Sequence, residues 1–174
     1  LIVTVERHLA QNPDDLAGWK VVAPVYKRAQ RWAEAAEALR NVVRLSPASA
    51  SILTDYVEAL VLANQGVVWA EANGLLTEAL RLDKTEPKAR YFAALALKQE
   101  GRAAEAKAAF EAFLADTPSD APWRDMLLAE MRDMSSRPPA PDQQTMEEAS
   151  GMSPEDRQKM IRGLVDGLEE KLKA

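Results

Sequence analysis

The chain has 174 residues, of which 47% are hydrophobic and only 6% aromatic, and it contains no cysteine. The lack of cysteine excludes disulfides, thiolate metal sites and a cysteine nucleophile, and the net charge of −5 argues against a general nucleic-acid binder, which would carry a basic stripe. Alanine and leucine dominate, with Glu, Arg and Lys between them, and Val and Ile form no alternating runs. This composition predicts an all-α protein without a β-sheet.

The predicted helices recur with a period of about 34 residues. A first helix fills residues 1–12 and ends before Pro13, and similar helix-ending segments follow at Pro47, Lys84 and Pro118, spaced 34, 37 and 34 residues apart. After each of them comes a helical stretch with large apolar residues near its start, and then an alanine-rich second helix. Small residues of this kind let paired helices approach, so the pattern predicts a stack of helical hairpins.

The recurring unit resembles the tetratricopeptide repeat (TPR), a helix–turn–helix unit. Three full repeats are predicted, at residues 16–49, 50–86 and 87–120. In the first repeat the matching positions are Trp19, Val22, Ala23, Tyr26, Ala35, Leu39, Val42 and Pro47. The second repeat has about three extra residues around "ANQGVVWAEA" and Lys84 in place of the closing proline. The third lacks the large aromatic residue early in its first helix, where Arg90 stands instead.

The TPR domain is predicted to cover residues 1–134. Further segments flank its three repeats. Residues 1–12 match the second helix of an earlier repeat, and residues 121–134 predict one more helix, which can cap the stack. A linker is predicted over 135–152, where three prolines fall within four residues. A C-terminal helix is predicted over 153–174: Ser153 is its N-cap, Pro154 lies in its first turn, and Asp156 completes a capping-box-like spacing.

Five stretches that occur in order make the resemblance more specific: "GWKVVAPVYKRAQRWAEAAEALRNVVRL", "LTDYVEALVLANQGVV", "LLTEALRLDKTEPKARYFAALALKQEGRAAEAKAAF", "DAPWRDML" and "MSPEDRQKMIRGLVDGLEEKLK". Together they look like the periplasmic part of the CcmI (CycH) family of cytochrome c biogenesis proteins, over nearly the whole chain. The resemblance implies a non-enzymatic protein without a cofactor that holds apocytochrome c, chiefly by its C-terminal helical region, for thiol reduction and haem ligation. It also implies other subunits of the haem ligation complex as partners, a periplasmic location, and a membrane anchor before Leu1.

Stacked helix pairs curve, and the first helix of each pair lines the concave face. Counted from each repeat start, the residues expected to bind a peptide on that face are Lys20, Pro24, Lys27, Arg28, Thr54, Asp55, Glu58, Leu62, Lys88, Tyr91, Leu95, Lys98 and Gln99. This set is apolar in the middle, basic at both flanks and acidic between. It therefore suits an amphipathic helix or an extended peptide with mixed charges.

Pro24 stands inside the predicted first helix of the first repeat. It has no N–H to donate to the carbonyl of Lys20, and a proline at such a position costs about 3 kcal/mol in an ordinary helix. Two interpretations stay open. The free Lys20 carbonyl accepts a hydrogen bond from a ligand or water at the binding face, or the proline is a tolerated kink whose carbonyl is simply hydrated.

Two other residues invite a functional interpretation. His8 is the only histidine, and because it has no histidine or cysteine partner we expect it to pack in the N-terminal helix rather than to bind haem or a metal. Trp69 lies in the insertion of the second repeat. We expect it to plug the enlarged turn, and the alternative is that it extends the groove as an aromatic anchor.

All six methionines lie between Met126 and Met160. Met126 and Met131 are predicted to pack in the capping helix. Met146, Met152 and Met160 offer an alternative role, because methionine is adaptable at binding surfaces and could let the tail dock into a groove.

Enzyme chemistry has little support in the sequence, since no Gly-rich phosphate loop, metal-ligand spacing or nucleophile-with-base pattern occurs. The leading expectation is a TPR domain that binds apocytochrome c in its concave groove. The alternatives are a TPR scaffold that assembles membrane partners and an adaptor for an unrelated peptide.

Overall fold

The computed structural model describes residues 2–136, together with residues 153, 156, 158, 159 and 162. In chain order the helices are α1 (Ile2–Gln11), α2 (Leu16–Arg28), α3 (Trp32–Leu45), α4 (Ala50–Ala63), α5 (Ala70–Leu82), α6 (Pro87–Gln99), α7 (Ala103–Asp116) and α8 (Arg124–Ser136). The described part of the chain contains helices and turns but no strand, which confirms the predicted fold class. Among these helices, none combines the length and hydropathy that a bilayer crossing requires.

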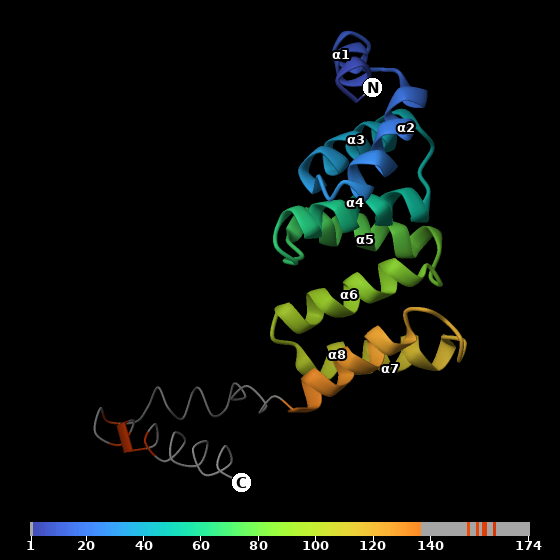
Figure 1. Ribbon diagram of the computed structural model, residues 1–174. Helices are drawn as coiled ribbons and strands as arrows, with labels where there is room; N and C mark the ends of the chain where they lie inside the picture. The colour runs from blue at the N-terminus through green and yellow to red at the C-terminus, as the bar shows by residue number, and fades with distance from the viewer. Residues whose placement is uncertain (1, 137–152, 154–155, 157, 160–161, 163–174) are drawn as a thin grey trace. The chain divides into compact units, whose positions relative to one another are not determined.

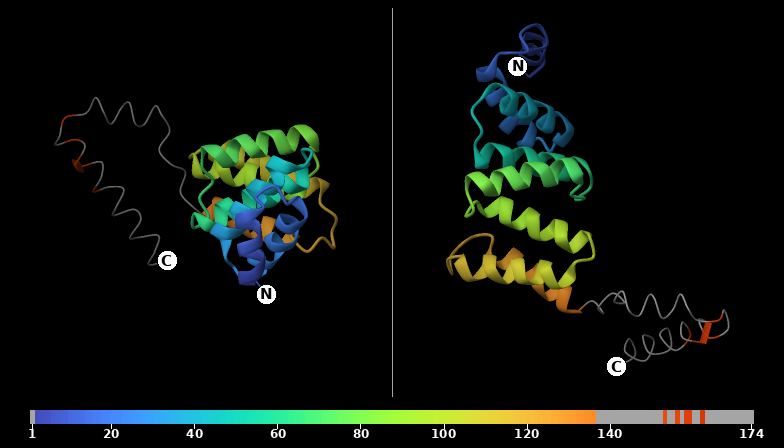
Figure 2. Two further views of the ribbon diagram at one scale, coloured as in Figure 1. Left: turned by 90° about the horizontal axis from the view of Figure 1, so that it is seen from above. Right: turned by 180° about the vertical axis from the view of Figure 1, so that it is seen from behind.

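The helices form antiparallel hairpins that stack in one direction (Figures 1 and 2). α2 pairs with α3, α4 with α5, and α6 with α7, so one hairpin falls within each of the ranges 16–49, 50–86 and 87–120. α1 precedes the first hairpin, and α8 packs on α7. α8 continues to Ser136, so residues 135 and 136 are helical where the sequence predicts the start of a linker.

The chain divides into two compact units, Leu1–Ser136 and Arg137–Ala174. Most of the predicted linker and C-terminal helix lies outside the described residues, together with Met146, Met152 and Met160. At the start of that helix, the Ser153 hydroxyl accepts a hydrogen bond from the Asp156 N–H at 3.3 Å and donates one to the Asp156 carboxylate at 2.7 Å. The first of these is the N-cap bond that the sequence predicts.

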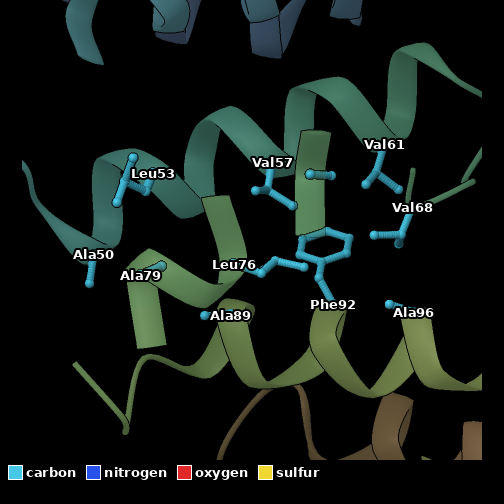
Figure 3. Close-up of a cluster of buried hydrophobic side chains, with 11 residues drawn as sticks. Ala50, Leu53, Val57, Val61, Val68, Leu76, Ala79, Ala89, Phe92 and Ala96 are labelled. Carbon is cyan, nitrogen blue, oxygen red and sulfur yellow. The ribbon is translucent and has the colours of Figure 1, made fainter. Parts of the chain in front are cut away.

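Small residues at the helix crossings let the hairpins pack closely. The alanines whose exposed fraction is zero are Ala35, Ala38, Ala59, Ala72, Ala79, Ala89, Ala94 and Ala106. Larger side chains from neighbouring helices fill the space beside them. Figure 3 shows the Phe92 ring reaching from α6 toward Val57 and Val61 of α4, with Val68 and Leu76 on either side. Each large apolar side chain buried in this way contributes about 1.5–3 kcal/mol to folding.

The turn inside each hairpin uses the same backbone device. Gln30, Gln65 and Gly101 follow the first helices in the left-handed conformation, with φ of 56°, 55° and 78°. The N–H groups of the next residues, Arg31, Gly66 and Arg102, bond to the carbonyls of Tyr26, Val61 and Leu97 at 3.0, 2.8 and 3.0 Å. This is the closing bond of the Schellman motif, which satisfies a helix-terminal carbonyl and reverses the chain. The three turns therefore share this closing bond, although the second turn adds another left-handed residue, Gly66, with φ of 88°.

Val68, and not Trp69, fills the enlarged turn of the second repeat. The Val68 side chain is buried, whereas Trp69 is 41% exposed, so the expectation that Trp69 plugs the turn is wrong. Gln99 of α6 holds the turn by accepting the Val68 N–H at 2.8 Å and donating to the Gly66 carbonyl at 2.7 Å. An apolar residue and a bidentate amide thus accommodate the insertion.

Arg90 occupies the place of the missing aromatic residue in the third repeat. Its guanidinium lies 4.8 Å from the centre of the Phe113 ring of α7 and pairs with Asp116 at 2.9 Å. A guanidinium stacked on a ring supplies both apolar contact and cation–π attraction. In the third repeat, therefore, the charged Arg90 makes the contact between α6 and α7 that an aromatic residue would otherwise make.

The junction of α1 and α2 depends on a very close approach at Gly18. Asp15 caps α2 by accepting the Gly18 N–H at 3.0 Å, and it also bonds to His8 Nε2 at 3.0 Å. The Gly18 N–H and, less strongly, His8 lower the pKa of Asp15. The expectation that His8 packs inside is wrong, because its side chain is 54% exposed. It links α1 to the cap of α2 instead.

Replacing Gly18 with alanine will destabilise the domain, although Gly→Ala in a helix interior normally stabilises. A Cβ at Gly18 would lie 2.7 Å from Cδ2 of the buried Leu9 and 2.8 Å from an Asp15 carboxylate oxygen, so the packed Leu9 side chain and the cap of α2 must both give way. We expect Gly18→Ala to lower the free energy of unfolding by about 1–3 kcal/mol, measured by urea unfolding followed by circular dichroism.

Gly74→Ala in α5 is the matched control. A Cβ there meets no atom within 4 Å, so the free energy of unfolding should rise by about 0.5–1 kcal/mol. Equal stabilisation by both substitutions would show that α1 is not seated against Gly18.

Candidate functional site

The first helices of the hairpins, α2, α4 and α6, share one surface with α8, which we call the first-helix face. Two pockets open on it. The basic pocket lies among α2, α3 and α4, has a volume of about 490 Å³, and is lined by Lys20, Ala23, Pro24, Lys27, Arg28, Leu39, Val42, Ile52 and Asp55. Five of the predicted binding residues therefore meet in one place: Lys20, Pro24, Lys27, Arg28 and Asp55.

The aromatic pocket lies at the other end of the face and has a volume of about 370 Å³. It is lined by Glu58, Glu86, Pro87, Lys88, Tyr91, Phe92, Phe113, Trp123 and Met126. The sequence predicts Glu58, Lys88 and Tyr91 as binding residues, but not the apolar walls around them. The stretch "DAPWRDML" carries the missing signal, because it reads as the start of a fourth first helix and so places Trp123 and Met126 on the same face.

Four charged residues join the two pockets. Lys27 of α2 bonds to Asp55 at 2.8 Å and to Glu58 at 2.6 Å, and Lys88 of α6 bonds to the same two carboxylates at 2.9 and 3.0 Å. We call these residues the ion cluster. Both ammonium groups lie within 3 Å of one Asp55 oxygen, so the pockets are neighbours along the face. The cluster spans three consecutive first helices.

The members of the ion cluster shift one another's pKa values. Burial would raise the pKa of Asp55, but the hydrogen bonds from Lys27 and Lys88 outweigh burial and hold that pKa below its ordinary value. Burial would lower the pKa of Lys88, and Asp55 and Glu58 outweigh it to raise that pKa. Asp55 and Lys88 therefore keep their charges at neutral pH, and the cluster pairs two basic side chains with two acidic ones.

A second set of contacts ties α6 to α8. Lys98 pairs with Glu130 and with Asp133, each at 2.7 Å, and the Tyr91 hydroxyl donates to Glu130 at 3.2 Å. Burial, followed by the charge of Glu130, raises the pKa of Tyr91 to about 12. Lys98 and Tyr91 thus hold the capping helix in place, and Tyr91 also forms a wall of the aromatic pocket.

The remaining predicted residues do not line either pocket. Thr54 is completely buried, with its hydroxyl bonded to the Ala50 carbonyl, so the prediction that it contacts a peptide is wrong. Leu95 packs against the core beside α4 and α5, and Gln99 is engaged by the α4–α5 turn. Leu62 is exposed on α4 but lies outside both pockets.

The two methionines of α8 behave differently. Met131 packs against the cluster around Phe110, as predicted. Met126 is 43% exposed and lines the aromatic pocket, so the prediction that it packs inside is wrong. A flexible thioether at a pocket rim can adapt to different apolar groups.

Within the part of the chain that the structure describes, the unpaired charges of the first-helix face are unevenly distributed. Lys20 and Arg28 of the basic pocket form no side-chain hydrogen bond or ion pair there, and neither does the Glu86 carboxylate at the rim of the aromatic pocket. The α2 end of the face is therefore positive, and its far end carries an unpaired negative charge.

Comparison with known proteins identifies relatives over the whole chain. The family model described as cytochrome c-type biogenesis protein H TPR domain matches residues 1–124. The chain is 39% identical over 181 residues to the cytochrome c-type biogenesis protein CycH of Rhizobium meliloti (strain 1021), covering 99% of this chain and 48% of the relative. It is 40% identical over 174 residues to the protein of the same name from Bradyrhizobium diazoefficiens, covering 99% and 47%. The chain thus spans about half the length of the curated relatives it matches.

Solved structures share the fold at low sequence identity. MamA matches with a TM-score of 0.56 and 18% identity, over 76% of this chain and 78% of that protein. YrrB, described as a TPR protein with an unusual peptide-binding site, matches with a TM-score of 0.56 and 19% identity, over 85% and 80%. At these identities the likeness shows the fold, which is that of TPR proteins.

Asp55→Asn tests the ion cluster. Removing one carboxylate leaves Lys27 and Lys88 with Glu58 alone, and we expect the free energy of unfolding at pH 7 to fall by about 1 kcal/mol. Because the folded-state pKa of Asp55 is lowered, its contribution is present above the unfolded-state pKa near 4 and is lost as the pH falls through the lower folded value. Urea unfolding between pH 7 and pH 3 should show the difference shrinking.

The control is Asp14→Asn, which removes a carboxylate with a 76% exposed side chain that pairs with Arg44. It should change stability little at any pH. An Asp55→Asn effect that persists undiminished at pH 3 would contradict the charge-based account.

Proposed function

The chain belongs to the family of cytochrome c-type biogenesis proteins H (CycH) that carry a TPR domain, and from this premise we propose that its first-helix face binds apocytochrome c. The ligand is the C-terminal helical region of the apocytochrome. The domain holds this region without chemistry of its own while other proteins of the haem ligation complex reduce the thiols and attach haem. This role places the domain in the periplasm, in a protein attached to the membrane.

The observation that carries the proposal is the pairing of two pockets on one face, joined by the ion cluster. An amphipathic helix needs an apolar groove for one side and polar contacts along the rim. The aromatic pocket supplies apolar walls from Tyr91, Phe113 and Trp123, and the basic pocket supplies Lys20 and Arg28. A polypeptide laid across α2, α4 and α6 would meet both.

The back of the stack supports a second candidate, a scaffold that assembles membrane partners. A pocket of about 340 Å³ opens among α5, α6 and α7, away from the first-helix face, and its lining includes Leu80, Ala93, Leu97, Ala109 and Ala112. A partner helix seated there would leave the first-helix face free. The two functions differ in which face a partner needs, so variants of one face separate them.

Arg28→Glu will weaken the binding of a haem-free peptide that represents the C-terminal helix of cytochrome c. Arg28 is exposed in the basic pocket without an acidic partner in the described structure, so reversing its charge repels an acidic ligand group without breaking the core. We expect the dissociation constant to rise about tenfold at low salt and less at high salt, measured by isothermal titration calorimetry.

Arg7→Glu on α1 is the matched control, because Arg7 is likewise exposed and has no charged partner among the described residues. Its effect should stay within twofold. Unchanged affinity in both variants would favour the scaffold function.

Pro24→Ala separates the two interpretations of the proline. α2 runs unbroken from Leu16 to Arg28, and Pro24 is exposed at the basic pocket. Alanine restores a backbone N–H that can donate to the Lys20 carbonyl. The free energy of unfolding should therefore rise, by up to about 3 kcal/mol. If the free carbonyl binds the ligand, peptide affinity falls several-fold while stability rises, as calorimetry and thermal melting would show. Higher stability with unchanged affinity would make Pro24 a tolerated kink.

A further inference from the structure

The two pockets of the first-helix face differ so much in chemistry that they select different parts of a ligand. Resting on the proposed function, we propose that the aromatic pocket receives one large apolar side chain of the bound polypeptide, while Lys20 and Arg28 receive an acidic group on the same polypeptide. This arrangement fixes which end of the ligand lies over α2 and which over α6 and α8.

The aromatic pocket is built to hold an apolar group. Its volume of about 370 Å³ far exceeds the roughly 10–15 Å³ that one water molecule needs, and it leaves room for an aromatic side chain. Water against the walls of Phe92, Phe113 and Met126 is released when an apolar group enters, which drives binding.

The walls of the aromatic pocket are held in place before a ligand arrives. Tyr91 packs edge-on against Phe92 and Phe110, with ring centres 5.4 and 6.1 Å apart, and its hydroxyl is bonded to Glu130. A preorganised pocket loses little entropy on binding, so its contribution to affinity is larger. Met126, partly exposed at the rim, is the adjustable wall.

The charges on the first-helix face determine where an acidic group of the ligand can bind. Lys27, Asp55, Glu58 and Lys88 satisfy one another, so they offer little net charge to a partner. Among the described residues that line the two pockets, the charges without a partner are those of Lys20 and Arg28 in the basic pocket and of Glu86 in the aromatic pocket. A complementary ligand is therefore acidic over α2, and it carries its apolar anchor with a basic neighbour over α6.

The helix packing sets the spacing of these two ligand groups. Lys20 and Arg28 stand on α2 and Tyr91 stands on α6, so the two contacts are two interhelical steps apart with α4 between them, and packed helices lie about 8–10 Å apart. A ligand helix that rises 1.5 Å per residue covers this span in roughly 11–13 residues. In an extended chain at about 3.3 Å per residue, five or six residues are enough.

Met126→Lys in the full chain tests the aromatic pocket, with the haem-free C-terminal helix peptide of cytochrome c as the probe. A charge at this exposed position spoils the pocket without disturbing the core, so the dissociation constant should rise at least tenfold. Leu82→Lys on α5 is the matched control, because Leu82 is 40% exposed and lies outside both pockets of the first-helix face. It should change the dissociation constant less than twofold, and thermal melting checks that both variants are folded.

Peptide variants then locate the two contacts. Replacing large apolar peptide residues one at a time by alanine should identify one whose effect is strong with the unaltered domain and absent with Met126→Lys. Replacing one acidic peptide residue, roughly 11–13 positions away in a helical ligand, by lysine should weaken binding to the unaltered domain and be rescued by Arg28→Glu. Fluorine NMR of the domain labelled with 5-fluorotryptophan should show the Trp123 signal shifting on titration while that of Trp69 stays fixed.

The outcomes separate this inference from the proposed function. Peptide binding that is equal in Met126→Lys and Leu82→Lys, with a fixed Trp123 signal, overturns the anchoring pocket but leaves apocytochrome binding standing. A peptide that does not bind the unaltered domain overturns both.

Discussion

The described structure depends on how closely successive hairpins approach one another, α3 against α4 and α5 against α6. Alanines with no exposed surface stand where the hairpins meet: Ala59 packs in the cluster of α4 with α2 and α3, and Ala89 lies in the cluster of α4, α5 and α6 whose remaining space Phe92 fills. A larger residue at those positions would push the hairpins apart. The same approach brings Lys27, Asp55 and Lys88 from three helices within hydrogen-bonding distance, so the ion cluster is a consequence of the packing.

The ion cluster also decides what the first-helix face can offer a partner. By sequence the face is rich in both signs of charge, and it would be expected to bind through many ion pairs. The packing pairs most of these charges with one another. A paired group contributes little binding free energy to a ligand, because it must give up one partner to gain another. What remains is a smaller and more selective set: two cations at one end, a carboxylate at the other, and an apolar pocket next to the neutralised centre.

α8 is more than a cap. Its bonds to Lys98 and Tyr91 fasten it to α6, and Met126 of its first turn closes the aromatic pocket together with Trp123, the residue that precedes it. A capping helix with a polar outer face would have kept the stack soluble without creating a site. In this family member the end of the stack is thus also where the face is most apolar, and this favours an anchor there.

The sequence by itself determined the repeat. Its period, its alanines and its helix-ending segments predict the hairpins within a few residues, because these features depend on local propensity and on spacing along one chain. It also placed Lys20, Pro24, Lys27, Arg28 and Asp55 on one surface.

Only the tertiary structure decided which members of that surface are available. Thr54 turned into the core, Gln99 bonded to a neighbouring turn, and Val68 rather than Trp69 filled the insertion. Phe113 of α7, a second helix, also lines the aromatic pocket. The repeat spacing shows which face of a helix a residue lies on. Whether that residue is buried, paired with a charge or part of a pocket wall depends on residues more than twenty positions away, which no local pattern encodes.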